Sequence, residues 1–506
     1  MEIPREYNAA VDLIGRNLAA GRGAKAAFID DRGECTYAQL AERVDRAANA
    51  LLSLGLRREE RIAIAMLDSC DWPALFLGAI KAGIVPVALN TLLTSADYEY
   101  QLRDSRAQAL FVSEPLLERF KPIRGRCPDL KHVVLQGRQL DELLAAAAAK
   151  FQAAPTTRDD MCFWLYSSGS TGAPKGTVHL HSHLILTAEL YAKPVLGIRE
   201  SDVVFSAAKL FFAYGLGNSL TFPMAVGATA VLMAERPTPD AVFKRLVEKK
   251  PTIFYGVPTL YAAMLASPGF PGREKLRLRT CTSAGEALPP DILKRFTERT
   301  GAELLDGIGS TEMLHIFLSN RPGDVKPGST GKPVPGYELR LVDDAGNVVT
   351  RPGELGELQI SGPTSAIMYW NQREKTKSTF QGPWTRSGDK YSFDEQGYYI
   401  YGGRSDDMLK VSGIWVSPAE VEAALVSHEA VLEAAVVGAE DEQKLVKPKA
   451  FVVLKPGRSA DESLKGELQK HVKDRLAPYK YPRWIEFLPE LPKTATGKIQ
   501  RFKLRA

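Results

Sequence analysis

Short apolar runs alternate with segments of helical apolar spacing over the first hundred residues of the chain. Strands are predicted at residues 26–30, 61–66 and 85–89, and amphipathic helices at 37–54 and 72–82. A glycine follows each predicted helix, as is common where helices end. This strand–helix–strand order predicts an α/β fold in which helices cover a mainly parallel sheet.

The pattern changes after the glycine pair at residues 402–403. Beyond it, helices are predicted at 418–426 and 462–476, and strands at 434–438 and 449–454. These elements are typical of a small α+β domain.

The chain is too long for a single comfortable core, since it has 506 residues. We therefore predict a large N-terminal domain at 1–403, a hinge at 404–408 and a small C-terminal domain at 409–506. Within the large domain, the alanine-rich residues 140–155 are interpreted as a surface helix and linker.

Composition narrows the class of protein. Hydrophobic residues make up 45% and charged residues 25%, as in ordinary soluble proteins. The net charge of +5 and the absence of a basic block argue against a nucleic-acid partner. No apolar run approaches the roughly 18 residues of a membrane span, and the N-terminus lacks an apolar secretory segment. Five scattered cysteines without a CxxC pair fit free thiols. We therefore expect a cytoplasmic protein without a membrane partner.

A loop rich in glycine and hydroxyl residues gives the first indication of chemistry. Residues 166–176 read YSSGSTGAPKG and follow an apolar run, 161–166, that predicts a buried strand. Glycines let backbone N–H groups turn toward one anion, while hydroxyls and Lys175 add donors and positive charge. Because Gly176 follows the lysine, the loop departs from the Walker pattern of P-loop NTPases. A phosphate-binding loop is predicted, with a flexible linker as the alternative.

This loop resembles the phosphate-binding signature of the adenylate-forming enzymes, the superfamily of acyl-CoA synthetases, luciferases and peptide-synthetase adenylation domains. Further blocks similar to the family's signatures are CTSAGEALP at 281–289, GIGSTE at 307–312, RSGD at 386–389, GR at 403–404 and LPKTATGKIQR at 491–501. The resemblance covers nearly the whole chain. It implies a large N-terminal domain and a small, mobile C-terminal domain.

The resemblance implies a nucleotide site. Thr311 is expected to contact phosphate and Glu312 to help hold Mg²⁺, because a carboxylate beside a glycine-rich turn can bind the ion that neutralises a triphosphate. Asp389 is expected to accept hydrogen bonds from the ribose hydroxyls. At Ile308 the chain departs from the aromatic residue that usually stacks on adenine. The expected ATP- and AMP-binding residues are Ser167, Ser168, Gly169, Ser170, Thr171, Lys175, Gly285, Glu286, Ala287, Asp306, Gly307, Ile308, Gly309, Ser310, Asp389, Tyr401 and Arg404.

A lysine near the C-terminus is the expected catalytic residue, together with Thr311 and Glu312. Taken alone, the segment around Lys498 is a basic tail. By resemblance, Lys498 contacts the substrate carboxylate and the α-phosphate, where loss of one preorganised donor typically costs about 3–4 kcal/mol of barrier. Asp406 matches the hinge about which the small domain rotates toward a thioester-forming pose. The CoA channel of that pose is expected to involve Lys410, Ser412, Gly413 and Trp415.

Residues 209–217, KLFFAYGLG, match the family's acyl-pocket segment. Their aromatic rings supply flat walls, and the segment has no acidic residue of the kind that holds the amino group of an amino-acid substrate. The whole pattern is most similar to benzoate–CoA ligases and related aryl-CoA ligases. His315 either faces a ring substituent or a held water, or is bonded to backbone at the pocket wall. The expected pocket residues are Phe212, Ala213, Tyr214, Ser283, Ala284, Gly309, His315 and Ile316.

Three alternating histidines, His179, His181 and His183, would share one face if the segment were a strand. They lack the cysteine or carboxylate spacing usual in metal sites, so a metal site is the weaker interpretation.

The resemblance implies an enzyme that uses ATP, Mg²⁺ and coenzyme A to convert benzoate or a substituted benzoate to its CoA thioester. The reaction passes through an aryl-adenylate and releases AMP and pyrophosphate. Two alternatives stay open: an aryl-adenylating enzyme that loads a carrier protein, and an oxygenase of the luciferase type. A homodimer is also left open.

Overall fold

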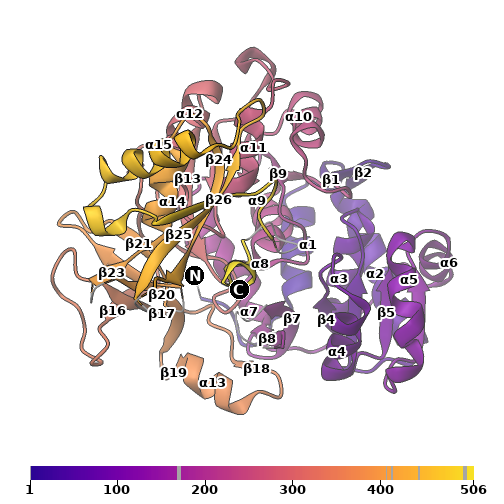
Figure 1. Ribbon diagram of the computed structural model, residues 1–506. Coiled ribbons are helices and arrows are strands. Elements are labelled where there is room, and N and C mark those ends of the chain that lie inside the picture. Colours follow the sequence, from indigo (N-terminus) through magenta and orange to yellow (C-terminus); the bar gives the residue numbers. More distant parts are fainter. Residues whose placement is uncertain are drawn as a thin grey trace.

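The computed structural model describes residues 2–167, 173–405, 407–411, 414–442, 445–493 and 499–505. Over these ranges, three sheets and the helices around them form the large N-terminal part, and two small sheets lie in the C-terminal part (Figure 1).

The first large sheet confirms the predicted strand–helix–strand order. Five of its strands are parallel, and β8 and β18 add two antiparallel strands at one edge. In spatial order the strands are β18 (Met368–Tyr369), β8 (Lys175–Leu180), β7 (Met161–Ser167), β4 (Val85–Ala88), β3 (Arg61–Ala65), β5 (Ala109–Val112) and β6 (His132–Leu135).

The second large sheet has a parallel centre and antiparallel strands at both ends. At one of these ends, the predicted strand β1 forms a hairpin with β2, which the apolar pattern did not predict. In spatial order the strands are β15 (Lys332–Pro333), β14 (Ile316–Ser319), β13 (Glu303–Gly309), β12 (Thr280–Ser283), β11 (Ile253–Gly256), β9 (Val203–Ser206), β10 (Thr229–Val231), β1 (Ala26–Asp30) and β2 (Gly33–Thr36).

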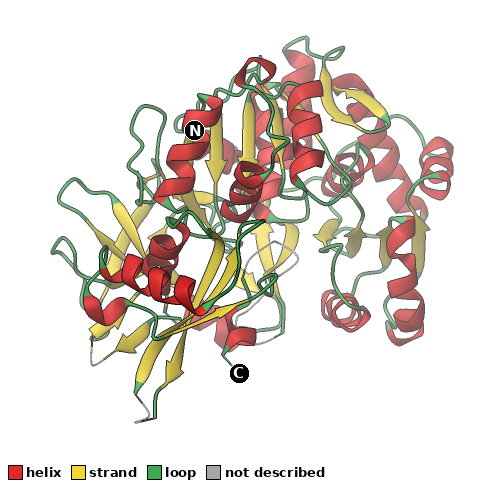
Figure 2. Cartoon of the chain, turned by 45° about the horizontal axis from the view of Figure 1, so that its top comes forward, coloured by secondary structure: helices red, strands yellow, loops and turns green. Residues whose placement is uncertain are grey.

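Helices flank both sheets, as Figure 2 shows. Helix α2 begins with a capping box in which Thr36 and Gln39 exchange hydrogen bonds with each other's backbone. It packs tightly on α3, since a Cβ at Gly78 would lie 2.6 Å from the Cβ of Ala47. The helices of this part are α1 (Ala9–Ala19), α2 (Tyr37–Ser53), α3 (Asp71–Lys81), α4 (Ser95–Ser105), α5 (Leu117–Phe120), α6 (Arg138–Ala146), α7 (His181–Thr187), α8 (Ala213–Leu216), α9 (Phe222–Val226), α10 (Pro239–Glu248), α11 (Pro258–Ala266), α12 (Pro290–Thr300) and α13 (Arg373–Thr379).

A third, antiparallel sheet precedes the C-terminal part. It consists of β16 (Glu338–Val342), β17 (Gly356–Ser361), β20 (Trp384–Phe393) and β19 (Phe380–Gln381), with β21 (Tyr399–Arg404) paired to β20.

Among its described residues, the C-terminal part combines a two-stranded and a three-stranded sheet with two α-helices. Its own buried clusters include Val436, Val452 and Leu468 on one face and Phe451 on the other. Strand β24 also packs against α11 of the large part. The elements are β22 (Leu409–Val411), β23 (Ile414–Val416), α14 (Pro418–Val426), β24 (Val431–Glu440), β25 (Val446–Leu454), α15 (Glu462–Lys473) and β26 (Trp484–Phe487).

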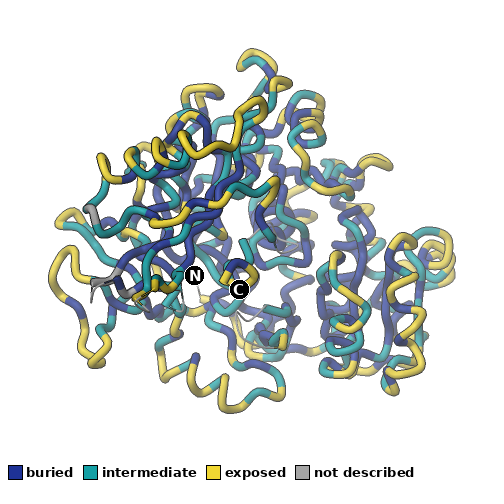
Figure 3. The backbone as a smooth tube through the Cα atoms, viewed as in Figure 1, coloured by how far each residue is buried: buried dark blue, intermediate teal, exposed yellow. Residues whose placement is uncertain are grey.

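Burial follows the layers: the central strands are buried, whereas exposure gathers on outer helix faces and loops (Figure 3). The ends of the predicted helices and strands lie within about three residues of the observed ends. Along the described chain, no helix combines the length and the apolar character needed to cross a membrane.

Candidate functional site

The predicted phosphate loop connects the two antiparallel strands β7 and β8. Ser167 and Lys175 face each other in the register, so the strands bring both ends of the loop together. The hydroxyl of Ser167 is buried and has no hydrogen-bond partner among the described residues. Residues 168–172, which include the predicted Ser168, Gly169, Ser170 and Thr171, lie outside the described part of the chain.

Lys175, Tyr369 and Glu312 form a cluster beside this loop. The ammonium of Lys175 lies 4.7 Å from the ring centroid of Tyr369, whose hydroxyl donates to Oε1 of Glu312 at 2.7 Å. Burial lowers the pKa of Lys175, and the nearby Glu312 carboxylate opposes this change. A partly buried cation beside a carboxylate suits a phosphate group with a divalent ion.

Tyr369 is a residue that the sequence analysis did not find. It reaches the cluster because β18 pairs with β8, placing Tyr369 opposite Thr177. Burial raises the pKa of its hydroxyl, and the carboxylate of Glu312 adds to the effect, so Tyr369 remains a donor.

The turn that carries Thr311 and Glu312 is held by buried histidines. Nε2 of His179 donates to the carbonyl of Thr311 at 2.8 Å, and Nδ1 of His179 lies 3.0 Å from Nδ1 of His183. Burial lowers the pKa of His179 to about 4, so the ring is neutral at pH 7.

The three alternating histidines do not share one face of a strand. Strand β8 ends at Leu180, and His181 and His183 belong to helix α7. Nδ1 of His181 accepts from the backbone of Ala9 at 3.1 Å. No group of three or more His, Cys, Asp and Glu side chains that could hold a metal occurs within the described ranges.

The carboxyl ends of parallel strands bring two predicted segments together. Ser283 ends β12 and pairs with Asp306 of β13. The Ser283 hydroxyl and Oδ1 of Asp306 are buried, with no hydrogen-bond partner among the described residues. Burial raises the pKa of Asp306, so its carboxyl favours the neutral form. This edge is where open α/β sheets bind ligands.

Two glycines at the end of β13, Gly307 and Gly309, lie close to the backbone of the neighbouring strand β14 or the residue before it. At Gly309, a Cβ would lie 2.5 Å from the carbonyl oxygen of His315, and at Gly307 it would lie 3.2 Å from that of Leu318. Ile308 lies between them and is half-buried against the core. The hydroxyl of Ser310 accepts from the backbone of Met313 at 3.1 Å, which caps the turn.

The predicted aryl pocket brings Tyr214 and His315 together. The ring centroids lie 5.6 Å apart, and Nε2 of His315 donates to the Tyr214 carbonyl at 3.3 Å and to Oδ1 of Asn218 at 3.2 Å. The Tyr214 hydroxyl is 2.5 Å from that of Thr282. His315 is therefore bonded to backbone through one nitrogen, while its buried Nδ1 has no partner within the described chain. Burial lowers its pKa to about 3.

The other predicted pocket residues are half-buried or buried. Phe212 is half-buried and its ring centroid lies 4.3 Å from that of Phe211. The remaining predicted residues, Ala213, Ala284 and Ile316, are buried.

The loop after β12 contacts the C-terminal part. Gly285 has a φ of +98°, a conformation that favours glycine. The backbone N–H of Ile499 donates to Oε1 of Glu286 at 3.1 Å. This bond joins the predicted nucleotide segment, which includes Ala287, to the chain just after the predicted catalytic lysine.

The predicted ribose residues lie on the paired strands β20 and β21. Asp389 is opposite Arg404, whose Nη1 lies 3.1 Å from Oδ1 of Asp389 and donates to the Ser387 carbonyl at 3.0 Å. Tyr401 lies on the same strand as Arg404, and burial raises the pKa of its hydroxyl.

Several predicted residues lie outside the described residues: Lys498, Asp406, Ser412 and Gly413. The backbones of Lys410 and Trp415 pair in the hairpin of β22 and β23.

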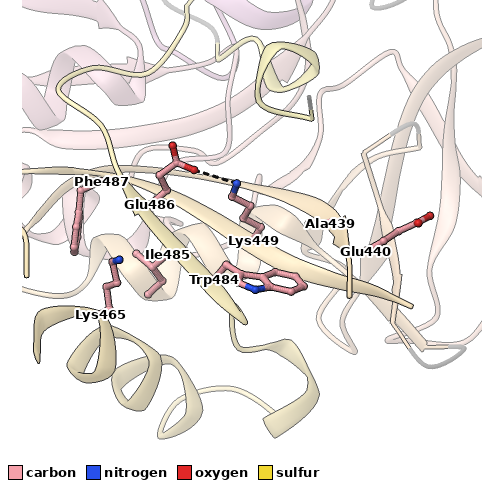
Figure 4. Close-up of a pocket in the computed structure, with 8 residues that line it drawn as sticks. All are labelled: Ala439, Glu440, Lys449, Lys465, Trp484, Ile485, Glu486 and Phe487. Atoms are coloured by element: carbon pink, nitrogen blue, oxygen red, sulfur yellow. Dashed lines mark ion pairs between the residues drawn. The ribbon is translucent and has the colours of Figure 1, made fainter. Parts of the chain in front are cut away.

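A surface hollow of about 590 Å³ lies away from these residues (Figure 4). It is in the C-terminal part, beside β26, where Lys449 pairs with Glu486 at 3.0 Å. None of its lining residues belongs to the predicted site; they are Ala439, Glu440, Lys449, Lys465, Trp484, Ile485, Glu486 and Phe487.

Comparison with known families decides the classification. The model of the AMP-binding enzyme family matches residues 16–370, and that of the AMP-binding enzyme C-terminal domain matches residues 420–498. The chain belongs to the AMP-binding enzyme family.

Full-length relatives narrow the class further. A benzoate–CoA ligase of Thauera aromatica is 66% identical over 511 residues, which cover 100% of this chain and 97% of that protein. A crystal structure of a benzoate CoA ligase from Burkholderia xenovorans LB400 has a TM-score of 0.94 at 58% identity and covers 99% of this chain and 100% of its own. A crystal structure of an anthranilate CoA ligase in complex with anthranoyl-AMP has a TM-score of 0.97 at 47% identity. The match covers 100% of this chain and 98% of that chain.

These likenesses confirm the predicted superfamily, the fold class and the class of enzyme, an AMP-forming aryl-CoA ligase that uses ATP, Mg²⁺ and CoA. They do not favour the carrier-loading alternative. The domain boundaries and the roles of individual residues stay predictions.

Proposed function

We propose that this chain activates benzoate or a small substituted benzoate at the turn that joins Glu312 to His315. The observation that carries the proposal is that one short turn holds both Glu312 and His315. Glu312 lies in the cluster with Lys175 and Tyr369, whereas His315 lies among aromatic rings with Tyr214. This arrangement supports binding of the nucleotide and the aromatic acid next to each other, on either side of the turn.

In the first half-reaction, a carboxylate oxygen of the acid attacks the α-phosphorus of ATP, and pyrophosphate leaves. Mg²⁺, when bound, neutralises charge on the phosphates. Glu312 would hold the ion. The partly buried ammonium of Lys175 near the Glu312 carboxylate supports a site for Mg²⁺ with phosphate. Lys175 offsets phosphate charge, Asp389 accepts hydrogen bonds from the ribose, and Lys498 offsets the charge that builds up as the acid and phosphate meet.

In the second half-reaction, the CoA thiolate attacks the acyl carbon and AMP leaves. The bond between Ile499 and Glu286 supports the assignment of the described arrangement to the first half-reaction, because it holds the C-terminal segment at the nucleotide segment. We infer that the small domain must rotate about Asp406 before CoA reacts.

The working environment is inferred to be a reducing one. All five cysteines are described, free and buried. Free thiols of this kind fit the cytoplasm better than an oxidising compartment.

An AMP-release assay with Mg²⁺, ATP and CoA tests the proposal across benzoate, 2-aminobenzoate, 4-hydroxybenzoate, cinnamate and octanoate. We expect CoA-dependent turnover to be strongest with a small benzoate. Preference for cinnamate or octanoate would overturn the assignment of Tyr214 and His315 to the pocket wall, and AMP release without any need for CoA would overturn the thioester step.

A further inference from the structure

Asp68 is a buried carboxylate that links the two large sheets. It lies in the loop between β3 and α3 and is 4% exposed. Its two oxygens lie 3.2 and 3.3 Å from the backbone nitrogen of Leu210, which donates to them. Leu210 belongs to the segment after β9 that forms the proposed aryl-pocket wall.

The neighbouring Lys209 anchors the other side of the same segment. Its ammonium donates to the carbonyls of Met233 and Glu235, the second at 2.7 Å. Burial lowers the pKa of Lys209, and the Asp68 carboxylate opposes this change. Burial raises the pKa of Asp68 to about 6, against the effects of Lys209 and the Leu210 N–H, so the carboxylate is charged at neutral pH.

The anchored segment leads directly into the pocket wall. The carbonyl of Lys209 accepts from the backbone of Phe212 at 3.0 Å, and helix α8 begins at the next residue. A Cβ at Gly215 would lie 2.0 Å from the Lys209 carbonyl oxygen, so the turn and the helix are in backbone contact. Packing this close passes any displacement of the turn on to Phe212 and Tyr214.

We propose that Asp68 is a positioning residue for the aromatic acid, acting through Leu210 on the wall formed by Phe212 and Tyr214. The inference rests on the proposed function, because it takes this wall to be the acid's binding site. Asp68 supplies a charged acceptor for the turn and a counter-charge for Lys209. Neither role involves the nucleotide cluster, so the effect of Asp68 is specific to the acid.

Steady-state kinetics of Asp68→Ala and Asp68→Asn test the proposal, with separate KM values for the aromatic acid, ATP and CoA. The matched control is Asp202→Asn. Asp202 is also 4% exposed and precedes β9, and its carboxylate accepts from Arg279 and Thr252 at the opposite end of that strand. Thermal unfolding of each variant establishes that it is folded.

We expect Asp68→Ala to raise the KM for the acid about tenfold or more, with the KM for ATP and CoA changed less than about twofold. Asp68→Asn keeps an acceptor for Leu210 and should raise the KM for the acid less. It provides the test if the alanine variant does not fold. Asp202→Asn should lower the melting temperature and leave the KM for the acid unchanged.

An unchanged KM for the acid in both folded Asp68 variants would overturn the inference while leaving the proposed function intact. An equal rise of all three KM values, matched by Asp202→Asn, would also overturn it, since it would show a general structural role. Failure of the wild-type enzyme to turn over or bind any aromatic acid would instead overturn the proposed function, and the inference with it.

Discussion

The backbone N–H of Ile499 donates to Oε1 of Glu286 at 3.1 Å, across 213 positions of sequence. Within the described chain, this bond joins the C-terminal segment to the loop after β12. Strand β24 packs against α11 of the large part as well. The arrangement therefore holds the chain next to Lys498 at the proposed nucleotide site, as the first half-reaction requires.

Glu286→Ala should weaken this arrangement. We expect the rate of pyrophosphate release to fall about tenfold, because a hydrogen bond to a charged group contributes about 1.5–3 kcal/mol. Thioester formation from supplied aryl-adenylate should fall less. The control is Glu433→Ala, which removes the partner of Lys493 within the C-terminal part, where the two groups are 2.6 Å apart. Equal loss of both half-reactions in Glu286→Ala alone would contradict a role in the pose.

Tyr369→Phe removes the hydroxyl that donates to Glu312 and keeps the ring beneath Lys175. We expect kcat/KM for Mg-ATP to fall about tenfold, corresponding to about 1.4 kcal/mol. The Mg²⁺ concentration needed for half-maximal activity should rise, because the orientation of Glu312 is less well fixed.

Tyr398→Phe is the matched control for this change. Tyr398 also lies under a lysine, with the ammonium of Lys332 4.1 Å from its ring centroid, and its hydroxyl donates to Asp324. It lies outside the proposed site and should leave kcat/KM unchanged. Equal effects of the two variants would argue against a specific role of Tyr369.

Buried histidines should make the fold sensitive to acid. Burial lowers the pKa of His181 to about 4, whereas the unfolded chain binds this proton near pH 6.5. The unfolded state therefore binds more protons between these values. The stabilisation from the neutral ring is fully present above about pH 6.5 and is lost as the pH falls toward 4, by about 1.4 kcal/mol per pH unit.

Urea unfolding at pH 7 and pH 5 measures this effect. His181→Asn keeps an acceptor for the Ala9 backbone but cannot titrate. We expect the free energy of unfolding to fall by about 2 kcal/mol more in the wild type than in His181→Asn over this interval. The same decrease in both proteins would contradict the assignment.

Local patterns predicted much of the fold. The apolar run at 161–166 became β7, and the helix predicted at 418–426 has the bounds of α14. The signals were local in each case: an apolar run before glycines, and Ser417 with Pro418 at a helix start. Lys175 and Glu312, singled out by motif, lie in one cluster with Tyr369.

Contacts between distant segments could not be predicted in the same way. Tyr369 reaches Lys175 through the pairing of β18 with β8, and Asp68 reaches Leu210 across 142 positions. No local sequence pattern marks Tyr369 or Asp68 as a residue that makes such a contact. The alternating histidines do not share one face because strand β8 ends among them, at Leu180.

We propose a two-step ligase in which Lys498 serves the first step. The most direct measurement compares the two half-reactions of Lys498→Ala with those of the wild type: pyrophosphate release from Mg-ATP with benzoate, and thioester formation from supplied benzoyl-adenylate and CoA. We expect Lys498→Ala to lose about 100- to 1,000-fold in the first half-reaction and to keep near-normal rates in the second. Equal losses in both half-reactions, or an unaffected first half-reaction, would contradict this role of Lys498.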